Sequence, residues 1–340
     1  AVNNTIVFTV ASVASKFVIG MMIALLLNSR LPFRNVITGL MLLPWIVPEV
    51  VTAMAWRSIF DPIFGGLTPI RIGQGVISRP YGWLSEPKLA MPSVIAVNIW
   101  KGIPFYTMLL LAGLKAIDRE LYEAAEVDGA ASIRRFRHIT LPGLKYVIIV
   151  TLLLSTISTF NTFGLVYLMT GGGPGGATRL YSILAYEKAI VGLRFGPGAA
   201  TAFSMAPVLA LFILVLARFM RADPASRTNE TRVDRAFDWV GRGLDAVLGL
   251  VFWPFEQLVR GTGRLFGALS APLKANRPAS QRNQPLFKRH QREQLGVVGR
   301  SLLMLPLLFF VLFPFYWIVI TSFKTDLQIQ QYSSIFWPEP

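Results

Sequence analysis

The stretch Glu123-Ala124-Ala125-Glu126-Val127-Asp128-Gly129-Ala130, followed by Ile139-Thr140-Leu141-Pro142, decides how this chain is interpreted. It is a short, charged segment between two long apolar runs. Ala and Glu favour helix, Gly129 ends or bends that helix, and Pro142 is tolerated in the first turn of the next one. If the flanking runs cross a membrane, the segment offers a soluble partner a surface to bind. The alternative is an ordinary amphipathic cytosolic loop.

The composition indicates an all-α, polytopic membrane protein. Hydrophobic residues make up 53% of the 340 residues and charged residues only 15%, which is too apolar for a soluble domain of this size. Runs of about 20 apolar residues cross a bilayer as helices, because lipid offers backbone polar groups no other partner. The sequence predicts about six such spans, at residues 4–27, 35–60, 89–113, 141–168, 200–220 and 301–322.

The charge distribution orients these spans. The chain has 33 basic and 18 acidic residues, a net charge of +15. Basic residues gather in cytoplasmic loops of membrane proteins, which places 115–138 and 221–300 on the cytoplasmic side. A basic tether for nucleic acid through 274–300 would bind with a steep salt dependence. We expect membrane lipid as the partner and no nucleic acid.

The sequence has few motifs typical of catalytic, metal-binding or nucleotide-binding sites. There is no Cys, and the two histidines, His138 and His290, have no ligand-like spacing around them, so we predict no metal site. The glycine run from Gly171 to Gly176 lacks the Lys-Ser/Thr that completes a phosphate-binding loop, and we interpret it as a flexible turn. Any ATP hydrolysis must therefore come from another polypeptide. We expect no enzyme activity and no cofactor on this chain.

The region 223–299 differs from the rest. Apolar residues recur near one face of a helical pattern around 237–251, which predicts an amphipathic helix on the inner leaflet. The run 276–292 is basic and Gln-rich and predicts a loose linker. A further spanning helix around 244–259 stays open, although its apolar run is short and contains Pro254.

Polar residues within the fourth span mark one candidate wall of a pathway. Hydroxyl residues recur at i, i+4, i+7 and i+11, which is one helical face. Such a face could bind a polyol or sugar without a charge, or its hydroxyls could bond their own backbone or a neighbouring helix. The face consists of Thr151, Ser155, Ser158 and Thr162, with Thr159 and Asn161 beside it.

The third span supplies a second candidate wall around Pro104, which breaks the helix. It mixes an amide, a cation and aromatic rings that suit sugar C–H surfaces. Its members are Asn98, Trp100, Lys101, Phe105 and Tyr106. Lys16 in the first span is also costly in lipid, and the sequence leaves open whether it reaches the membrane surface or lines a cavity. The predicted pathway residues are Asn98, Trp100, Lys101, Tyr106, Ser155, Ser158, Thr159, Asn161 and Thr162.

The opening motif resembles the cytoplasmic coupling motif of ABC importer permeases. Residues 1–222 are similar to the carbohydrate-uptake branch, the maltose and glycerol-phosphate type. The similar stretches include Leu43-Pro44-Trp45-Ile46-Val47-Pro48, Trp100-Lys101-Gly102-Ile103-Pro104-Phe105 and Met169-Thr170-Gly171-Gly172-Gly173-Pro174. Two positions depart from the pattern: Gly164 stands where Asp is frequent, and Ile190 where Phe is common.

This resemblance implies the type I ABC importer permease fold in a bacterial inner membrane, crossed many times. It implies three partners: an ABC ATPase dimer that carries the ATP and Mg, an extracytoplasmic solute-binding protein and a second permease half. The solute would be a sugar, oligosaccharide or glycerol-phosphate-like compound, moved by alternating access. The ATPase would bind at Glu123, Ala124, Ala125, Asp128, Gly129, Leu141 and Pro142. The alternative, a membrane-embedded glycosyl-transferring enzyme, needs carboxylates or His at membrane level, and the spans contain almost none.

The C-terminal region carries a separate resemblance. Residues 307–324 are similar to the first span of the partner permease of the same family. We therefore expect a permease core at 1–222 with five spans and without the family's first span, a cytoplasmic linker at 223–299, and the first span and start of a second permease half at 300–340. A single permease with an added tail is the other interpretation.

Overall fold

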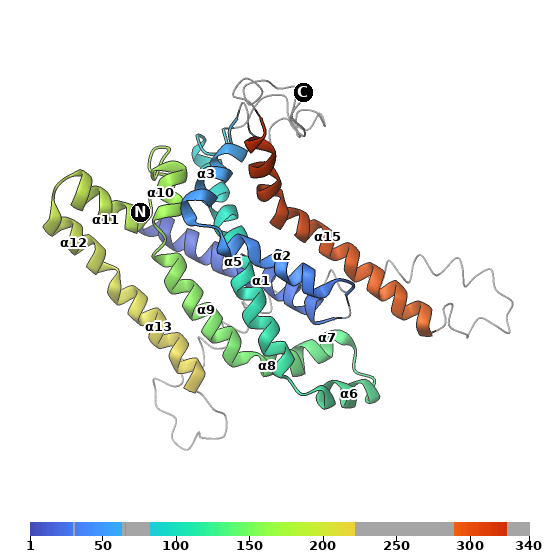
Figure 1. Cartoon of the computed structure of the whole chain (residues 1–340). Helices are drawn as coiled ribbons and strands as arrows, with labels where there is room; N and C mark the ends of the chain where they lie inside the picture. The colour runs from blue at the N-terminus through green and yellow to red at the C-terminus, as the bar shows by residue number, and fades with distance from the viewer. Residues whose placement is uncertain (30, 63–64, 66–81, 222–288, 325–340) are drawn as a thin grey trace, which may run out of the picture.

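The computed structural model describes residues 1–29, 31–62, 65, 82–221 and 289–324 (Figure 1). All regular structure in these ranges is helical, so the predicted all-α class is confirmed. By length and composition, four of the described helices can each cross a bilayer, and two sharply bent helix pairs raise the number to as many as six. The predicted amphipathic helix and the segment 244–259 lie outside the described residues.

The centre of the bundle is a pair of long helices, α1 (Val2–Asn28) and α5 (Pro87–Ala116). Gly20 of α1 lies against Tyr106 of α5, and Gly102 of α5 lies against Lys16 of α1. The two contacts have the same sequence offset, so the helices run parallel and in register. Glycines let two backbones approach closely in a membrane bundle, where packing drives association.

The predicted span 35–60 is two helices. Helix α2 (Arg34–Ile46) and helix α3 (Glu49–Ile59) meet at an angle of 95°. Pro44 is accommodated inside α2, whereas the break falls at Val47, whose ψ of 131° is extended. Pro48 is the physical reason, because a residue before proline is driven out of the helical region.

The coupling segment and the fourth predicted span form a chain of short elements. These are α6 (Arg119–Val127), α7 (Ser132–Arg135), the π-helix η1 (Phe136–Thr140), α8 (Leu141–Gly143), α9 (Lys145–Phe160) and α10 (Gly164–Thr170). The chain bends by 67° between Ser132–Gly143 and Lys145–Phe160. The predicted span 141–168 is therefore interrupted at Leu144 and again after Phe160.

The remaining elements flank the bundle on two sides (Figure 1). On one side are α11 (Tyr181–Tyr186), the π-helix η2 (Glu187–Val191), α12 (Phe195–Ser204) and α13 (Ala206–Arg221). On the other side α15 (Arg289–Ser322) packs against α2 and α3. This helix begins before residue 301, so the last residues of the predicted loose linker, 289–292, are helical.

Candidate functional site

Helix α6 is a capped, self-contained helix. At its start the Asp118 carboxylate accepts the backbone N–H of Glu120 at 3.2 Å. At its end the N–H of Ala130 donates to the carbonyl of Ala125 at 2.8 Å, and Gly129 donates to Glu126 at 3.1 Å. This paired bonding is the Schellman termination, which requires the left-handed conformation that Gly129 adopts at φ +71°. The structure thus confirms that the residues before Gly129 form a helix and that Gly129 terminates this helix.

Helix α6 protrudes beyond the bundle, at the lower end of Figure 1, and none of its residues is buried. Glu123, Ala124 and Asp128 are exposed, and Val127 is 88% exposed. Two side-chain contacts attach the helix to the elements that follow. The hydroxyls of Tyr122 and Thr140 lie 2.9 Å apart, and Glu126 forms an ion pair with Arg135 at 3.5 Å. An apolar side chain this exposed on a charged helix is available to a partner.

Leu141 and Pro142 are placed differently from the rest of the predicted coupling set. They form the start of α8, where Leu141 packs partly into the core and Pro142 stays exposed. A Cβ on the next residue, Gly143, would fall 2.9 Å from Cδ1 of Ile117, just after α5. Gly143 and Ile117 therefore lie close together where the segment begins and ends, so Leu141 and Pro142 lie at its base and not on its exposed face.

A buried polar contact joins α1, α5 and α9. The Lys16 ammonium donates to the Thr159 hydroxyl at 3.1 Å, and Lys16 is only 5% exposed. Gly102 makes this possible, because a Cβ there would fall 2.6 Å from Cε of Lys16. Thr159 belongs to the predicted pathway, whereas Lys16 does not. Its signal in the sequence was a cation within an apolar run.

Several buried polar atoms near this contact have no hydrogen-bond partner. They are the hydroxyl oxygens of Thr9 and Ser12 on α1, Oδ1 of Asn98 on α5 and the hydroxyl oxygen of Thr156 on α9. The in-register packing of α1 on α5 places Ser12 at the level of Asn98, one turn from Lys16 and Gly102. Unpaired polar groups in an apolar interior are costly, so this seam between α1, α5 and α9 is a candidate binding region for a polar solute. We call it the polar seam.

Trp100 and Lys101 make contacts away from the polar seam. The buried Trp100 donates its indole N–H to the carbonyl of Val311 in α15 at 3.0 Å. Its ring lies 5.7 Å from the ring of Trp56 and 5.6 Å from that of Phe315. Lys101 donates to the carbonyl of Val47 at 2.6 Å. Lys101 thus satisfies a carbonyl at the α2–α3 break, and Trp100 attaches α5 to α15.

Tyr106 and the hydroxyl residues of α9 divide between buried and exposed positions. Tyr106 is fully buried against Gly20. Thr151, Ser155 and Thr159 are buried, a face with a strict four-residue spacing. Ser158 and Asn161 are exposed, and Thr162 donates to the carbonyl of Ser158 at 3.3 Å. The predicted polar face includes residues 158 and 162. The structure differs because α9 ends at Phe160, so residue 162 does not continue the helical spacing.

Glu49 is a charged residue that the predicted pathway did not include. Its carboxylate accepts the backbone N–H of Leu165 at 2.8 Å, at the start of α10. Gly164 leaves room for it, because a Cβ there would lie 3.0 Å from Oε2 of Glu49. The sequence signal was Gly164 itself, a departure from the family pattern. Among the described residues, no group of three His, Cys, Asp or Glu side chains could hold a metal ion.

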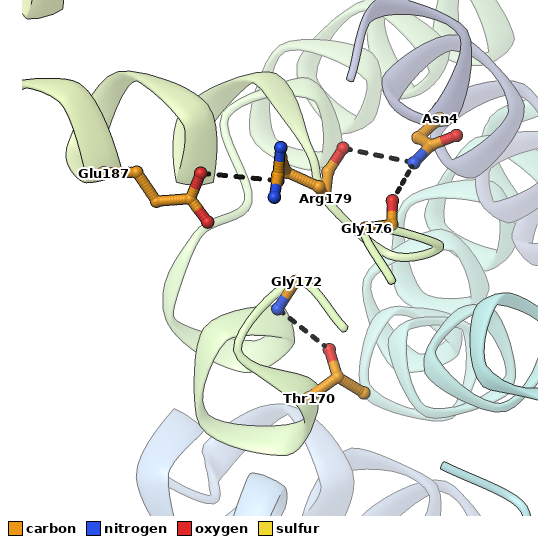
Figure 2. Close-up of polar contacts among 6 residues, drawn as sticks. All are labelled: Asn4, Thr170, Gly172, Gly176, Arg179 and Glu187. Atoms are coloured by element: carbon orange, nitrogen blue, oxygen red, sulfur yellow. Dashed lines mark hydrogen bonds and ion pairs between the residues drawn. The ribbon is translucent and has the colours of Figure 1, made fainter. Parts of the chain in front are cut away.

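The glycine run is an ordered turn held by α1 (Figure 2). The Asn4 amide donates to the carbonyls of Gly176 at 2.9 Å, Ala177 at 3.1 Å and Arg179 at 3.3 Å. The N–H of Gly172 donates to the Thr170 hydroxyl at 3.4 Å. Arg179 pairs with Glu187 at 3.3 Å. The turn was predicted to be flexible, and these bonds show that it is fixed to two neighbouring elements.

Transport proteins have sequences and folds similar to this chain. The trehalose/maltose transport system permease protein MalF of Thermococcus litoralis is 41% identical over 212 residues, which are 62% of this chain and 69% of that protein. The sulfoquinovosyl glycerol transport system permease protein SmoG of Agrobacterium fabrum is 35% identical over 221 residues, 64% of this chain and 69% of that one. A bacterial ABC transporter that imports the acidic polysaccharide alginate contains a similar chain, with a TM-score of 0.59 and 25% identity over 65% of this chain and 78% of that one.

The family description fits residues 16–222, a range that includes α5, the capped helix α6, the broken helices and the polar seam apart from Thr9 and Ser12. The chain belongs to the family of binding-protein-dependent transport system inner membrane components.

Proposed function

We propose that this chain is the membrane-spanning permease of an ATP-driven carbohydrate importer in a bacterial inner membrane. The observation that carries the proposal is the exposed, capped helix α6, held between α5 and α9 at one end of the bundle. A rigid short helix in this position transmits motion from a bound partner to the two long helices that flank it. The partner is an ABC ATPase dimer, which carries the ATP and Mg.

The importer works by alternating access, and its solute arrives on an extracytoplasmic binding protein. The family description supports this second partner, because its members depend on binding proteins. The solute class rests on the relatives, whose transport systems carry trehalose and maltose and sulfoquinovosyl glycerol. The lactose transport system permease protein LacF of Rhizobium radiobacter is also similar, at 32% identity over 219 residues. The unpaired hydroxyl and amide atoms of the polar seam suit a solute with many hydroxyl groups.

The proposal includes the arrangement expected from the sequence, in which α15 is the first span of a second permease half. Three contacts support a specific packing position of α15 against α3 and α5. Trp317 donates to the Ser58 hydroxyl at 3.2 Å, Trp100 donates to Val311, and the rings of Trp56 and Phe310 lie 6.4 Å apart. Spans of two halves that pack by such contacts would move together.

The test uses the full chain, reconstituted in proteoliposomes with its ATPase subunits and binding protein. Uptake of radiolabelled maltose, lactose and methyl β-D-glucuronide is measured with and without ATP. We expect ATP-dependent uptake of at least one of these sugars, lost in Glu123→Ala and in Gly129→Val while both variants stay in the membrane. Glu86→Ala is the matched control, because Glu86 is exposed at the other end of α5. Uptake that persists without ATP, or in both α6 variants, would refute the proposal.

A further inference from the structure

Lys16 is an ammonium group without a counter-charge inside an apolar helix. It is 5% exposed, within the 27-residue helix α1. Its hydrogen-bond partner is the neutral hydroxyl of Thr159 at 3.1 Å, and no carboxylate in the described part of the chain pairs with it. An ammonium has three donors, so two of them are left for another acceptor. A buried charge of this kind usually marks a functional site.

Lys101 and Glu49, which lie near the α2–α3 break, already have hydrogen-bond partners. Lys101 donates to the Val47 carbonyl and lies within the field of Glu49. Glu49 in turn accepts the N–H of Leu165. Lys101 and Glu49 therefore have their partners outside the polar seam, whereas Lys16, within it, pairs with no carboxylate among the described residues.

Unpaired polar groups lie close to Lys16 along the polar seam. Gly102 leaves room for the Lys16 side chain itself, since a Cβ there would fall 2.6 Å from Cε of Lys16 and 3.1 Å from its Nζ. One turn away, Oδ1 of Asn98 and the hydroxyl of Ser12 are buried without partners, and Asn98 is only 8% exposed. These acceptors and donors can bind sugar hydroxyls, while the ammonium can bind an anion.

We propose that Lys16 makes the polar seam selective for solutes that carry an anionic group, a sugar with a carboxylate, sulfonate or phosphate substituent. The ammonium binds the anionic group, and Asn98 and Ser12 bind hydroxyls one turn away. This inference rests on the proposed function and narrows its substrate class. A neutral sugar would leave the buried charge uncompensated, because hydroxyl dipoles replace a counter-ion only in part.

The test compares two probes that differ only at one carbon, methyl β-D-glucuronide and methyl β-D-glucoside. Their binding to the complex of the full chain with its ATPase subunits, in nanodiscs and without the binding protein, is measured by saturation-transfer NMR. We expect the glucuronide to bind at least tenfold more tightly than the glucoside. Lys16→Met should remove this preference and leave glucoside binding within a factor of two.

Lys188→Met is the matched control. Lys188 also donates to a threonine hydroxyl at 3.1 Å, that of Thr201, but away from the polar seam. This variant should keep the preference for the glucuronide. Equal binding of the two probes to the wild type, or a preference that survives in Lys16→Met, overturns the inference.

A thermal melt separates selectivity from a structural role. Removing an uncompensated buried charge should leave the melting temperature of Lys16→Met in probe-free nanodiscs unchanged or higher. A lower melting temperature would show that the Lys16–Thr159 bond is structural and would also overturn the inference. If sugar uptake is intact in proteoliposomes but the charge preference is absent, the transport function stands and only this inference fails.

Discussion

Gly20 of α1 lies directly on Tyr106 of α5: a Cβ on Gly20 would fall 2.5 Å from the Cβ of Tyr106 and 3.3 Å from the N of Thr107. The obstacle is the fixed base of a side chain and backbone, so no rotamer change can relieve it. Together with Gly102 beside Lys16, this contact fixes the parallel register of the two central helices. The relative positions of the polar groups of α1 and α5 along the polar seam depend on this register.

Replacing Gly20 with alanine should therefore destabilise the bundle. We expect a loss of about 1–3 kcal/mol, the usual cost of overpacking a filled interior. The measurement is a thermal melt in detergent, where the variant should unfold at a lower temperature than the wild type. Gly39→Ala in α2 is the control, because a Cβ at Gly39 meets nothing within 4 Å. Equal losses in both variants would mean that the close approach is not the cause.

Glu49→Ala should loosen α10 from α3. The change removes the carboxylate that accepts the N–H of Leu165 at the positive end of α10. A lost helix cap costs about 1 kcal/mol, and hydrogen exchange of the Leu165 amide should speed up accordingly. Glu86→Ala is the matched control, since Glu86 stands at the N-cap of α5 without a side-chain cap bond. Unchanged exchange at Leu165 would contradict the capping role.

Trp100→Phe should weaken the attachment of α15 while keeping most of the aromatic packing. The substitution removes the donor to the Val311 carbonyl but retains a ring beside Trp56 and Phe315. A single hydrogen bond contributes about 1 kcal/mol, and a thermal melt should show a loss of that size. Trp45→Phe, at an exposed position, should have no effect. If Trp100→Phe melts at the same temperature as the wild type, the hydrogen bond from Trp100 to Val311 adds nothing to stability.

Asn4→Asp should release the glycine turn from α1. The wild-type amide donates to three carbonyl oxygens, whereas a carboxylate of the same shape has no donor and would face them with a negative charge. Amide exchange across 171–178 should accelerate several-fold, as measured by hydrogen–deuterium exchange and mass spectrometry. The neighbouring exposed Asn3 provides the control, Asn3→Asp, which should leave the exchange unchanged. Identical exchange in the two variants would disprove the anchoring role of Asn4.

The helical class and the approximate spans follow from the sequence because lipid imposes a length and a composition on any crossing helix. The interruptions do not follow as directly. Pro44 and Pro48 carry the same local signal, yet α2 accommodates the first and breaks at the second. At that break the Val47 carbonyl accepts a hydrogen bond from Lys101 of the distant helix α5, which is a tertiary contact. No local pattern contains that information.

Only part of the candidate functional site could be predicted from the sequence, because part of it depends on tertiary contacts. The capped helix α6 is a local structure, so its residues could be identified from the motif alone. The polar seam depends on how three distant helices meet. Lys16, Gly102 and Thr159 converge only because two glycines set the register of α1 on α5. A periodicity argument along α9 therefore reached Thr159 and missed its partner.

The break between α2 and α3 and the interruption after Phe160, at the end of α9, have a joint mechanical consequence. Helix α3, beyond the first break, packs against α10, beyond the second, and Glu49 ties them together. The bundle is thus built in two tiers, with α2 and α9 below the joints and α3 and α10 above them. Rotation at the joints would tilt the upper tier as one block. Movement of α9 at one end of the bundle would thus be converted at the other end into a change in the tilt of α3 and α10.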